Sequence, residues 1–112
     1  MLPKPNRLTK KKDFDLVFKK GESVKNGFLI FKMLKSNLPE SRFGFVVSRK
    51  VSGKATVRNK VKRRLRDAIF LRLKELKGVI DVVVITLPGI EKKEFLEIQN
   101  MVGGGLKKLK II

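Results

Sequence analysis

The lysines and arginines of residues 54–66 are the side chains whose type and spacing have the clearest chemical meaning. They occupy seven of these thirteen positions, and no acidic residue interrupts them. On a helix, like charges four residues apart repel each other by a few tenths of a kcal/mol. A solvated helix face is the alternative, but such a face normally mixes both signs of charge. Because phosphates neutralise such a run and release their counterions, the pattern predicts a phosphate-binding surface.

The whole chain carries the same excess of positive charge. It has 28 Lys and Arg against 10 Asp and Glu, a net charge of +18 on 112 residues. Self-repulsion of this size weakens a compact state, which favours a polyanionic partner such as nucleic acid or an anionic membrane. The hydrophobic content of 42% is enough for the core of one folded domain, so we expect a single domain over residues 1–112.

Groups suited to catalysis or metal binding are scarce. The chain has no cysteine and no histidine, which excludes disulfides and makes a zinc site very unfavourable. Its carboxylates are scattered, without the spacing of an acid/base pair or a metal cage. We therefore expect no catalytic residues and no metal ligands in the protein.

Three aromatic residues, Phe14, Phe18 and Phe31, have two competing interpretations. Aromatic side chains are most often buried, which favours a role in the core. In a groove bordered by lysine and arginine, however, they would form a stacking surface for unpaired bases.

Hydrophobic spacing predicts the elements that position these residues. Pro3 and Pro5 disfavour helix, so residues 1–8 are expected to form an exposed, extended basic arm. A short helix over residues 10–20 follows, capped by Thr9 and ended by Gly21. Residues 27–35 and 41–50 are predicted to form an antiparallel pair of strands.

Period-two alternation divides these two strands between a core face and a mixed, partly open face. The core face is expected to carry Phe28, Ile30, Leu34, Phe43, Phe45 and Val47. The mixed face is expected to carry Leu29, Phe31, Val46, Ser48 and Lys50.

The second half of the chain predicts a long helix over residues 57–77, capped by Thr56 and ended by Gly78. The apolar run of residues 78–89 fits a strand buried on both faces and parallel to an earlier strand. The last segment has helical spacing that runs through residues 103–105, which are three glycines. Three glycines destabilise a helix by about 3 kcal/mol relative to three alanines. We therefore expect either one continuous helix with a soft segment or a break there.

In their order and spacing, three stretches of the sequence resemble the bacterial ribonuclease P protein subunit. These are "NRLTKKKDFDLVFKKGESV", "RFGFVVSRKVSGKATVRNKVKRRLRDAI" and the hydrophobic strand with the final helix, together covering residues 6–109. "RNKVKRRLRD" is similar to the Arg-Asn-Arg helix signature of that family, with Lys60 where the family usually has its second arginine.

The resemblance implies the fold, which is α+β in one domain with a small mixed sheet of about four strands. The implied order is α-β-β-β-α-β-α (ribosomal protein S5 domain 2-like), with a left-handed crossover between the parallel strands. Sequence physics alone would predict a right-handed crossover.

The resemblance also implies a function, which is to assist an RNA enzyme that removes the 5′ leader of precursor tRNA. In that family the RNA subunit and its Mg²⁺ ions perform the catalysis, so the protein alone is expected to bind no cofactor. The residues implied to bind the catalytic RNA are Arg58, Asn59, Lys60, Lys62, Arg63 and Arg66. Those implied to bind the leader are Phe14, Phe18, Leu29, Phe31, Val46, Ser48 and Lys50.

The implied partners are thus the catalytic RNA and precursor tRNA, in the cytoplasm, with no membrane and no obligate protein partner. A ribosomal or architectural nucleic-acid-binding protein is the main alternative. A protein of anionic membrane surfaces is a third candidate, but it needs an apolar face beside the charges that the core does not use.

Overall fold

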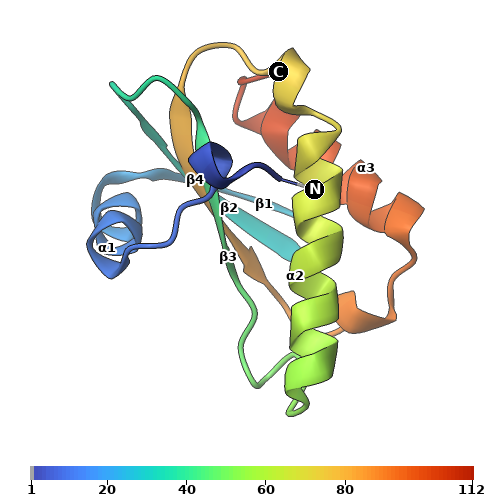
Figure 1. Ribbon diagram of the computed structural model, residues 1–112. Coiled ribbons are helices and arrows are strands. Elements are labelled where there is room, and N and C mark those ends of the chain that lie inside the picture. Colours follow the sequence, from blue (N-terminus) through green and yellow to red (C-terminus); the bar gives the residue numbers. More distant parts are fainter. Residues whose placement is uncertain (1) are drawn as a thin grey trace.

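Strand β4 (Ile80–Thr86) lies inside a four-stranded sheet in the computed structural model, which describes residues 2–112 (Figure 1). Its neighbours are β2 (Leu29–Lys35), which is antiparallel, and β3 (Arg42–Val46), which is parallel. Strand β1 (Glu22–Asn26) extends the sheet beyond β2. The buried, parallel strand is therefore confirmed, but the predicted pairing of β2 with β3 is wrong, because β4 lies between them.

The helices cover both faces of this sheet (Figure 1). Helices α2 (Ala55–Phe70) and α3 (Phe95–Lys108) pack together on one face, over the larger hydrophobic core. Helix α1 (Lys11–Lys20) covers the other face over a smaller cluster of Leu8, Val17 and Val83. Short 3₁₀ turns lie at Lys4–Asn6 (η1), Leu73–Glu75 (η2) and Ile90–Lys92 (η3). The α+β class, the single domain and the predicted order of elements are confirmed.

Helix α2 is shorter than the sequence predicts. It begins after Lys54, which makes no side-chain cap, and it ends at Phe70 instead of residue 77. Beyond the helix the hydrogen bonds change from the α-helical to the tighter 3₁₀ spacing. The backbone N–H of Arg72 donates to the carbonyl of Ile69, and the η2 turn follows. This tightening lets Leu73 and Leu76 pack against the core before the chain turns back into β4.

Helix α3 continues through its three glycines, and its neighbours explain why they are there. A Cβ atom on Gly105 would overlap the ring of Phe31, and one on Gly104 would overlap the side-chain amide of Asn26. The glycines let the helix backbone lie directly on β1 and β2. The continuous helix, one of the two alternatives predicted, is the one observed.

Residues 2–8 do not form the exposed arm that the two prolines predict. Leu2 is completely buried in the main core, and Leu8 is buried beneath α1. The backbone of Arg7 bridges to Phe43, and the N–H of Leu8 donates to the Phe43 carbonyl at 2.9 Å. The segment therefore covers part of β3, which is an edge strand with unpaired backbone groups.

The faces of β2 are the reverse of those predicted. Leu29, Phe31 and Met33 are buried in the core beneath α2 and α3, whereas Ile30 and Leu34 face α1 with Val83 and Ile85. Both faces of this strand are apolar, so alternation alone does not determine which one is covered by two helices. In β3 the assignment is right, since Phe43 and Phe45 face the main core and Val46 faces the other way.

Candidate nucleic-acid interface

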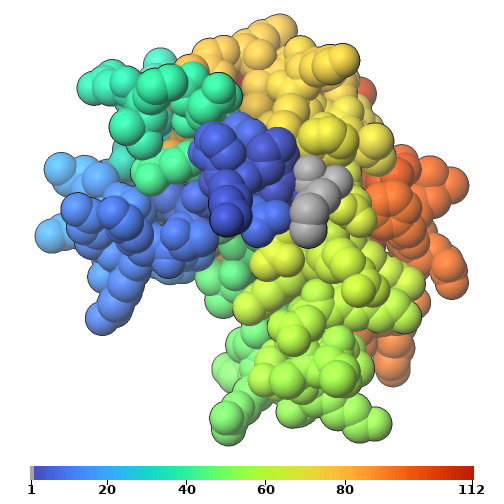
Figure 2. All heavy atoms as spheres, viewed as in Figure 1, coloured from blue at the N-terminus to red at the C-terminus, as the bar shows by residue number. Residues whose placement is uncertain are grey.

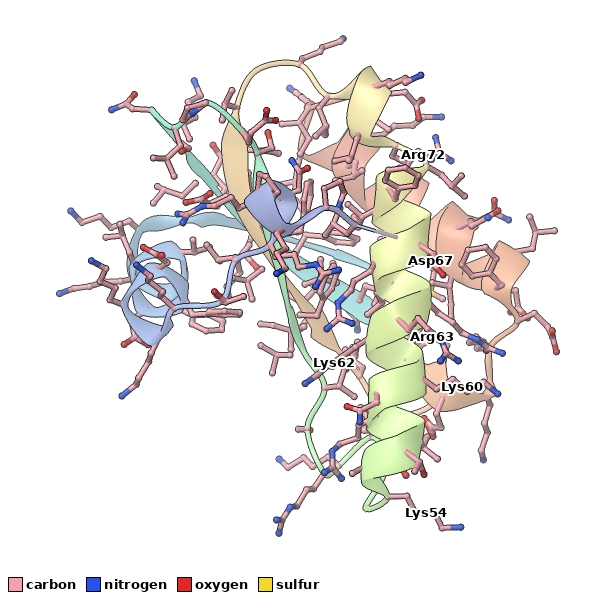
Figure 3. The ribbon with its side chains drawn as sticks, viewed as in Figure 1. Lys54, Lys60, Lys62, Arg63, Asp67 and Arg72 are labelled. Carbon is pink, nitrogen blue, oxygen red and sulfur yellow. The ribbon has the colours of Figure 1, made fainter. Side chains whose placement is uncertain are left out.

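Helix α2 presents cations on every side except the one it buries. Val61, Leu65, Ala68 and Ile69 form the buried stripe. Side chains three or four residues apart share a helix face, so the basic residues fall into three rows. Arg58, Lys62 and Arg66 flank the stripe on the side of α1, Asn59 and Arg63 face outward, and Lys60 and Arg64 flank it on the side of α3. Figure 3 shows Lys62 and Lys60 pointing to opposite sides of the helix.

Two of these arginines also fix the helix in place. The Nη1 of Arg58 donates to the carbonyl of Ser52 at 3.0 Å, which holds the connection before α2. The Nη1 of Arg64 donates to the carbonyl of Lys93 at 3.1 Å, which ties α2 to the segment before α3. By contrast, Asn59, Lys60 and Arg63 are exposed, so their side chains are the most accessible of the predicted RNA-binding set.

Helix α1 is held against the sheet by a charged cluster around Arg42. This guanidinium donates to both carboxylate oxygens of Asp81, at 3.0 and 2.7 Å, and to Asp13 of α1 at 3.2 Å. The hydrogen bonds to Asp81 raise the pKa of Arg42 above its ordinary value. A paired, forked contact of this kind is geometrically specific, so the cluster fixes where α1 lies.

Two aromatic rings of α1 lie over the sheet. The ring centroids of Phe14 and Phe18 are 6.5 Å apart. Phe14 lies directly on Gly44, where a Cβ atom would overlap the ring. Phe18 is 39% exposed, and the Nζ of Lys32 lies 5.9 Å from the centroid of its ring. This pair combines an accessible aromatic surface with a cation.

The structure brings together part of the predicted leader-binding set. Phe14, Phe18 and Val46 lie on the side of the sheet that α1 covers, and Ser48 and Lys50 are exposed just beyond the end of β3. This surface is here called the groove beside α1. Leu29 and Phe31 do not belong to this groove, because they are fully buried on the opposite face of the sheet. Figure 2 shows the outline of the molecule indented between α1 and the connection from β3 to α2.

A small pocket of about 210 Å³ joins the groove to α2. Its lining residues are Arg7, Leu8, Thr9, Phe14, Phe43, Phe45, Lys62 and Arg66. Three of them are cations from two distant parts of the chain, and none is acidic. The two predicted sites therefore meet at the edge of β3.

Sequence reasoning missed Arg7 and Lys32. The two prolines predict an exposed arm that would include Arg7, but the Nε of Arg7 donates to the Leu2 carbonyl at 2.8 Å and holds the segment on the domain. Lys32 shares a face of β2 with Ile30 and Leu34. If the alternation had been assigned with that face toward α1, it would have placed Lys32 beside the aromatic residues of α1.

Within residues 2–112, no group of three or more acidic, histidine or cysteine side chains is placed to hold a metal ion. The helices in this part of the chain are all too short or too polar to cross a membrane. The apolar stripe of α2 is buried in the core, which disfavours a membrane-surface protein.

Fold and interface together define a small, basic α+β protein that binds nucleic acid. More particularly, the chain belongs to the ribonuclease P protein family, whose model matches residues 2–110. It is 36% identical to the ribonuclease P protein component of Alkaliphilus metalliredigens over 96% of each chain. It is also 36% identical to that of a Pseudanabaena species, covering 100% of this chain and 97% of the relative.

Solved structures of RNase P proteins have the same fold. A mutant of the Staphylococcus aureus protein superposes with a TM-score of 0.88 at 31% identity, covering 97% of this chain and 92% of that one. The Thermotoga maritima protein gives 0.82 at 33% identity, covering 91% of this chain and 96% of that one. The resemblance inferred from the sequence is thus confirmed, and the chain is a protein subunit of ribonuclease P.

Proposed function

We propose that this protein binds the catalytic RNA of ribonuclease P through α2 and the 5′ leader of precursor tRNA through the groove beside α1. The RNA subunit cleaves the leader, and the protein contributes binding and positioning in the cytoplasm. The distribution of charge on α2 carries the proposal. Its first three turns have cations on three sides and no carboxylate, while its apolar stripe is used by the core.

The assignment of catalysis to the RNA is supported by the chemistry of the side chains. The chain has no histidine or cysteine, and within residues 2–112 its carboxylates are not clustered. Asp13 of α1 and Asp81 of β4 are both engaged by Arg42. These residues do not fit a Mg²⁺ site, so we assign the magnesium ions of the holoenzyme to the RNA.

The residues proposed to bind the catalytic RNA are Arg58, Asn59, Lys60, Lys62, Arg63 and Arg66. Those proposed for the leader are Phe14, Phe18, Lys32, Val46, Ser48 and Lys50. Because the pocket beside Lys62 and Arg66 opens toward Phe14, a strand can pass from the α2 surface over the edge of β3 into the groove.

Arg63→Ala tests the α2 surface, because Arg63 is exposed and lies away from the buried stripe. Losing one phosphate contact should lower the slope of log affinity against log salt concentration by roughly 0.7 to 0.9. The measurement is binding to ribonuclease P RNA across a salt series. Lys74→Ala, which removes an exposed charge from the η2 turn, is the matched control.

An unchanged slope for Arg63→Ala would contradict the phosphate contact. Co-purification tests the partner itself. Recovery of one structured RNA of the ribonuclease P type supports the proposal, and recovery of ribosomal RNA or duplex DNA would favour a ribosomal or architectural role.

A further inference from the structure

A second basic surface lies at the end of the molecule opposite the N-terminus of α2. Four segments of chain meet there around a hollow of about 770 Å³, here called the C-terminal hollow. It is lined by Glu22, Met33, Lys35, Ser36, Asn37, Lys77, Gly78, Val79, Ile80, Lys108, Leu109, Lys110 and Ile111.

The floor and the rim of the hollow differ in character. Met33, Ile80, Leu109 and Ile111 are buried and form an apolar floor. The rim carries four exposed lysines, Lys35, Lys77, Lys108 and Lys110, against the single carboxylate of Glu22. Within residues 2–112, no salt bridge joins any of these lysines to a carboxylate. The hollow is therefore a concave surface with uncompensated positive charge.

The helix dipole explains only part of this cluster. Lysines near a helix C-terminus are favoured by its negative pole, and the Nζ of Lys108 also donates to the carbonyl of Lys25 at 2.9 Å. Lys35 and Lys77 come from the end of β2 and from the segment before β4, so the dipole of α3 does not account for them. Their convergence with the end of α3 needs a separate reason.

Lys110 is the most unusual of the four. Its φ of 60° makes it the only non-glycine residue of the described chain with a left-handed backbone. Lys110 donates to the carbonyl of Lys107 and Ile111 donates to that of Leu106, which is the pattern of a Schellman cap. Glycine is the preferred residue at this position. A lysine there places an ammonium group at the hollow where the fold itself favours glycine.

We infer that the C-terminal hollow binds phosphates of an RNA backbone, as a second contact separate from the α2 surface. This inference rests on the proposed function, because an RNA partner is what brings phosphates to the protein. The two surfaces lie at opposite ends of α2, whose 16 residues span about 24 Å (Figure 1). They therefore contact different segments of RNA. Ammonium groups suit this role, since lysine binds phosphate as a flexible point charge.

A triple variant tests the inference: Lys35→Ala, Lys77→Ala and Lys110→Gly. Lys110→Gly also relieves the left-handed backbone, so its own contribution should raise the melting temperature. The control triple is Lys74→Ala, Lys92→Ala and Lys107→Ala, which removes the same charge from exposed lysines that do not line the hollow. The hollow triple should lower the salt slope for ribonuclease P RNA by about 2.1 to 2.7, at 0.7 to 0.9 per contact. The control triple should leave it unchanged.

Lysine acetylation gives a second measurement on the unmodified protein. Assembly with ribonuclease P RNA should protect Lys35, Lys77 and Lys110, and uridine monophosphate at the same phosphate concentration should not. Equal protection by the mononucleotide would overturn the assignment to an RNA backbone and indicate a site for free phosphate esters.

The two proposals fail separately. If Arg63→Ala lowers the salt slope but the hollow triple behaves like its control, this inference is wrong and the function of α2 stands. If neither the Arg63→Ala variant nor the hollow triple changes the slope, the proposed function is wrong as well.

Discussion

Phe18 is the residue on which the leader groove depends most directly. Its ring is partly exposed, lies beside Phe14 and has the ammonium of Lys32 near its face. Stacking of one base on an aromatic ring contributes about 1 to 3 kcal/mol, so Phe18→Ala should weaken binding of leader-bearing precursor tRNA by roughly 5- to 150-fold. Mature tRNA should bind the reconstituted enzyme almost as before. The measurement is the affinity for both substrates.

Leu16→Ala is the matched control, because Leu16 is another exposed apolar residue of α1. It should leave both affinities unchanged. If Phe18→Ala weakened both substrates equally, or melted far below the native protein, the ring would not be a leader contact.

The position of Phe31 shows that residue type alone does not determine which face of a strand a side chain occupies. Its sequence neighbours place apolar residues on both faces of β2, so the phase of the strand is fixed only when α3 packs on it. Because Phe31 is fully buried against Gly105, Phe31→Ala should cost about 3 to 5 kcal/mol of folding stability. Thermal or denaturant unfolding measures this loss. A small change in stability would contradict its place in the core.

At the scale of elements, substitutions of the glycines in α3 distinguish the effect of helix propensity on stability from the effect of packing. Gly105→Ala gains about 1 kcal/mol of propensity, but its Cβ would overlap the ring of Phe31, and overpacking costs typically 1 to 3 kcal/mol. Gly103→Ala meets only the guanidinium end of Arg72, which is flexible and can move. Gly105→Ala should therefore lower the free energy of unfolding, and Gly103→Ala should raise it. Denaturant unfolding of both variants measures these changes. Equal changes in the free energy of unfolding would contradict the close packing of α3 on Phe31.

Local patterns predicted elements well and their arrangement poorly. The turn residues between β2 and β3 suggest a hairpin, yet β4, about 40 residues further on, lies between the two strands. That insertion depends on contacts between distant segments, which no local spacing encodes. The basic surface of α2 can be predicted because all its residues lie within one short stretch of sequence. The pocket that joins Arg7 to Lys62 and Arg66 exists only in the folded chain.

At the scale of the whole molecule, the net charge of +18 is held within 36 × 28 × 24 Å. Within residues 2–112 few ion pairs offset it, and one arginine, Arg42, already engages both Asp13 and Asp81. Repulsion of this size weakens the folded state, so anions that bind the folded protein should stabilise it.

Millimolar sulfate should therefore raise the melting temperature above that in chloride at the same ionic strength. Binding at ten times the dissociation constant adds about 1.4 kcal/mol, or roughly 5 °C for a domain of this size. Sulfate also stabilises proteins by exclusion from their surface, but that effect does not saturate at low concentration. The increase should level off with concentration. It should be smaller in a Lys60→Ala, Arg63→Ala double variant, because these exposed cations belong to the α2 surface proposed to bind RNA phosphates. Equal midpoints in the two salts would show that charge repulsion does not limit the stability of the free protein.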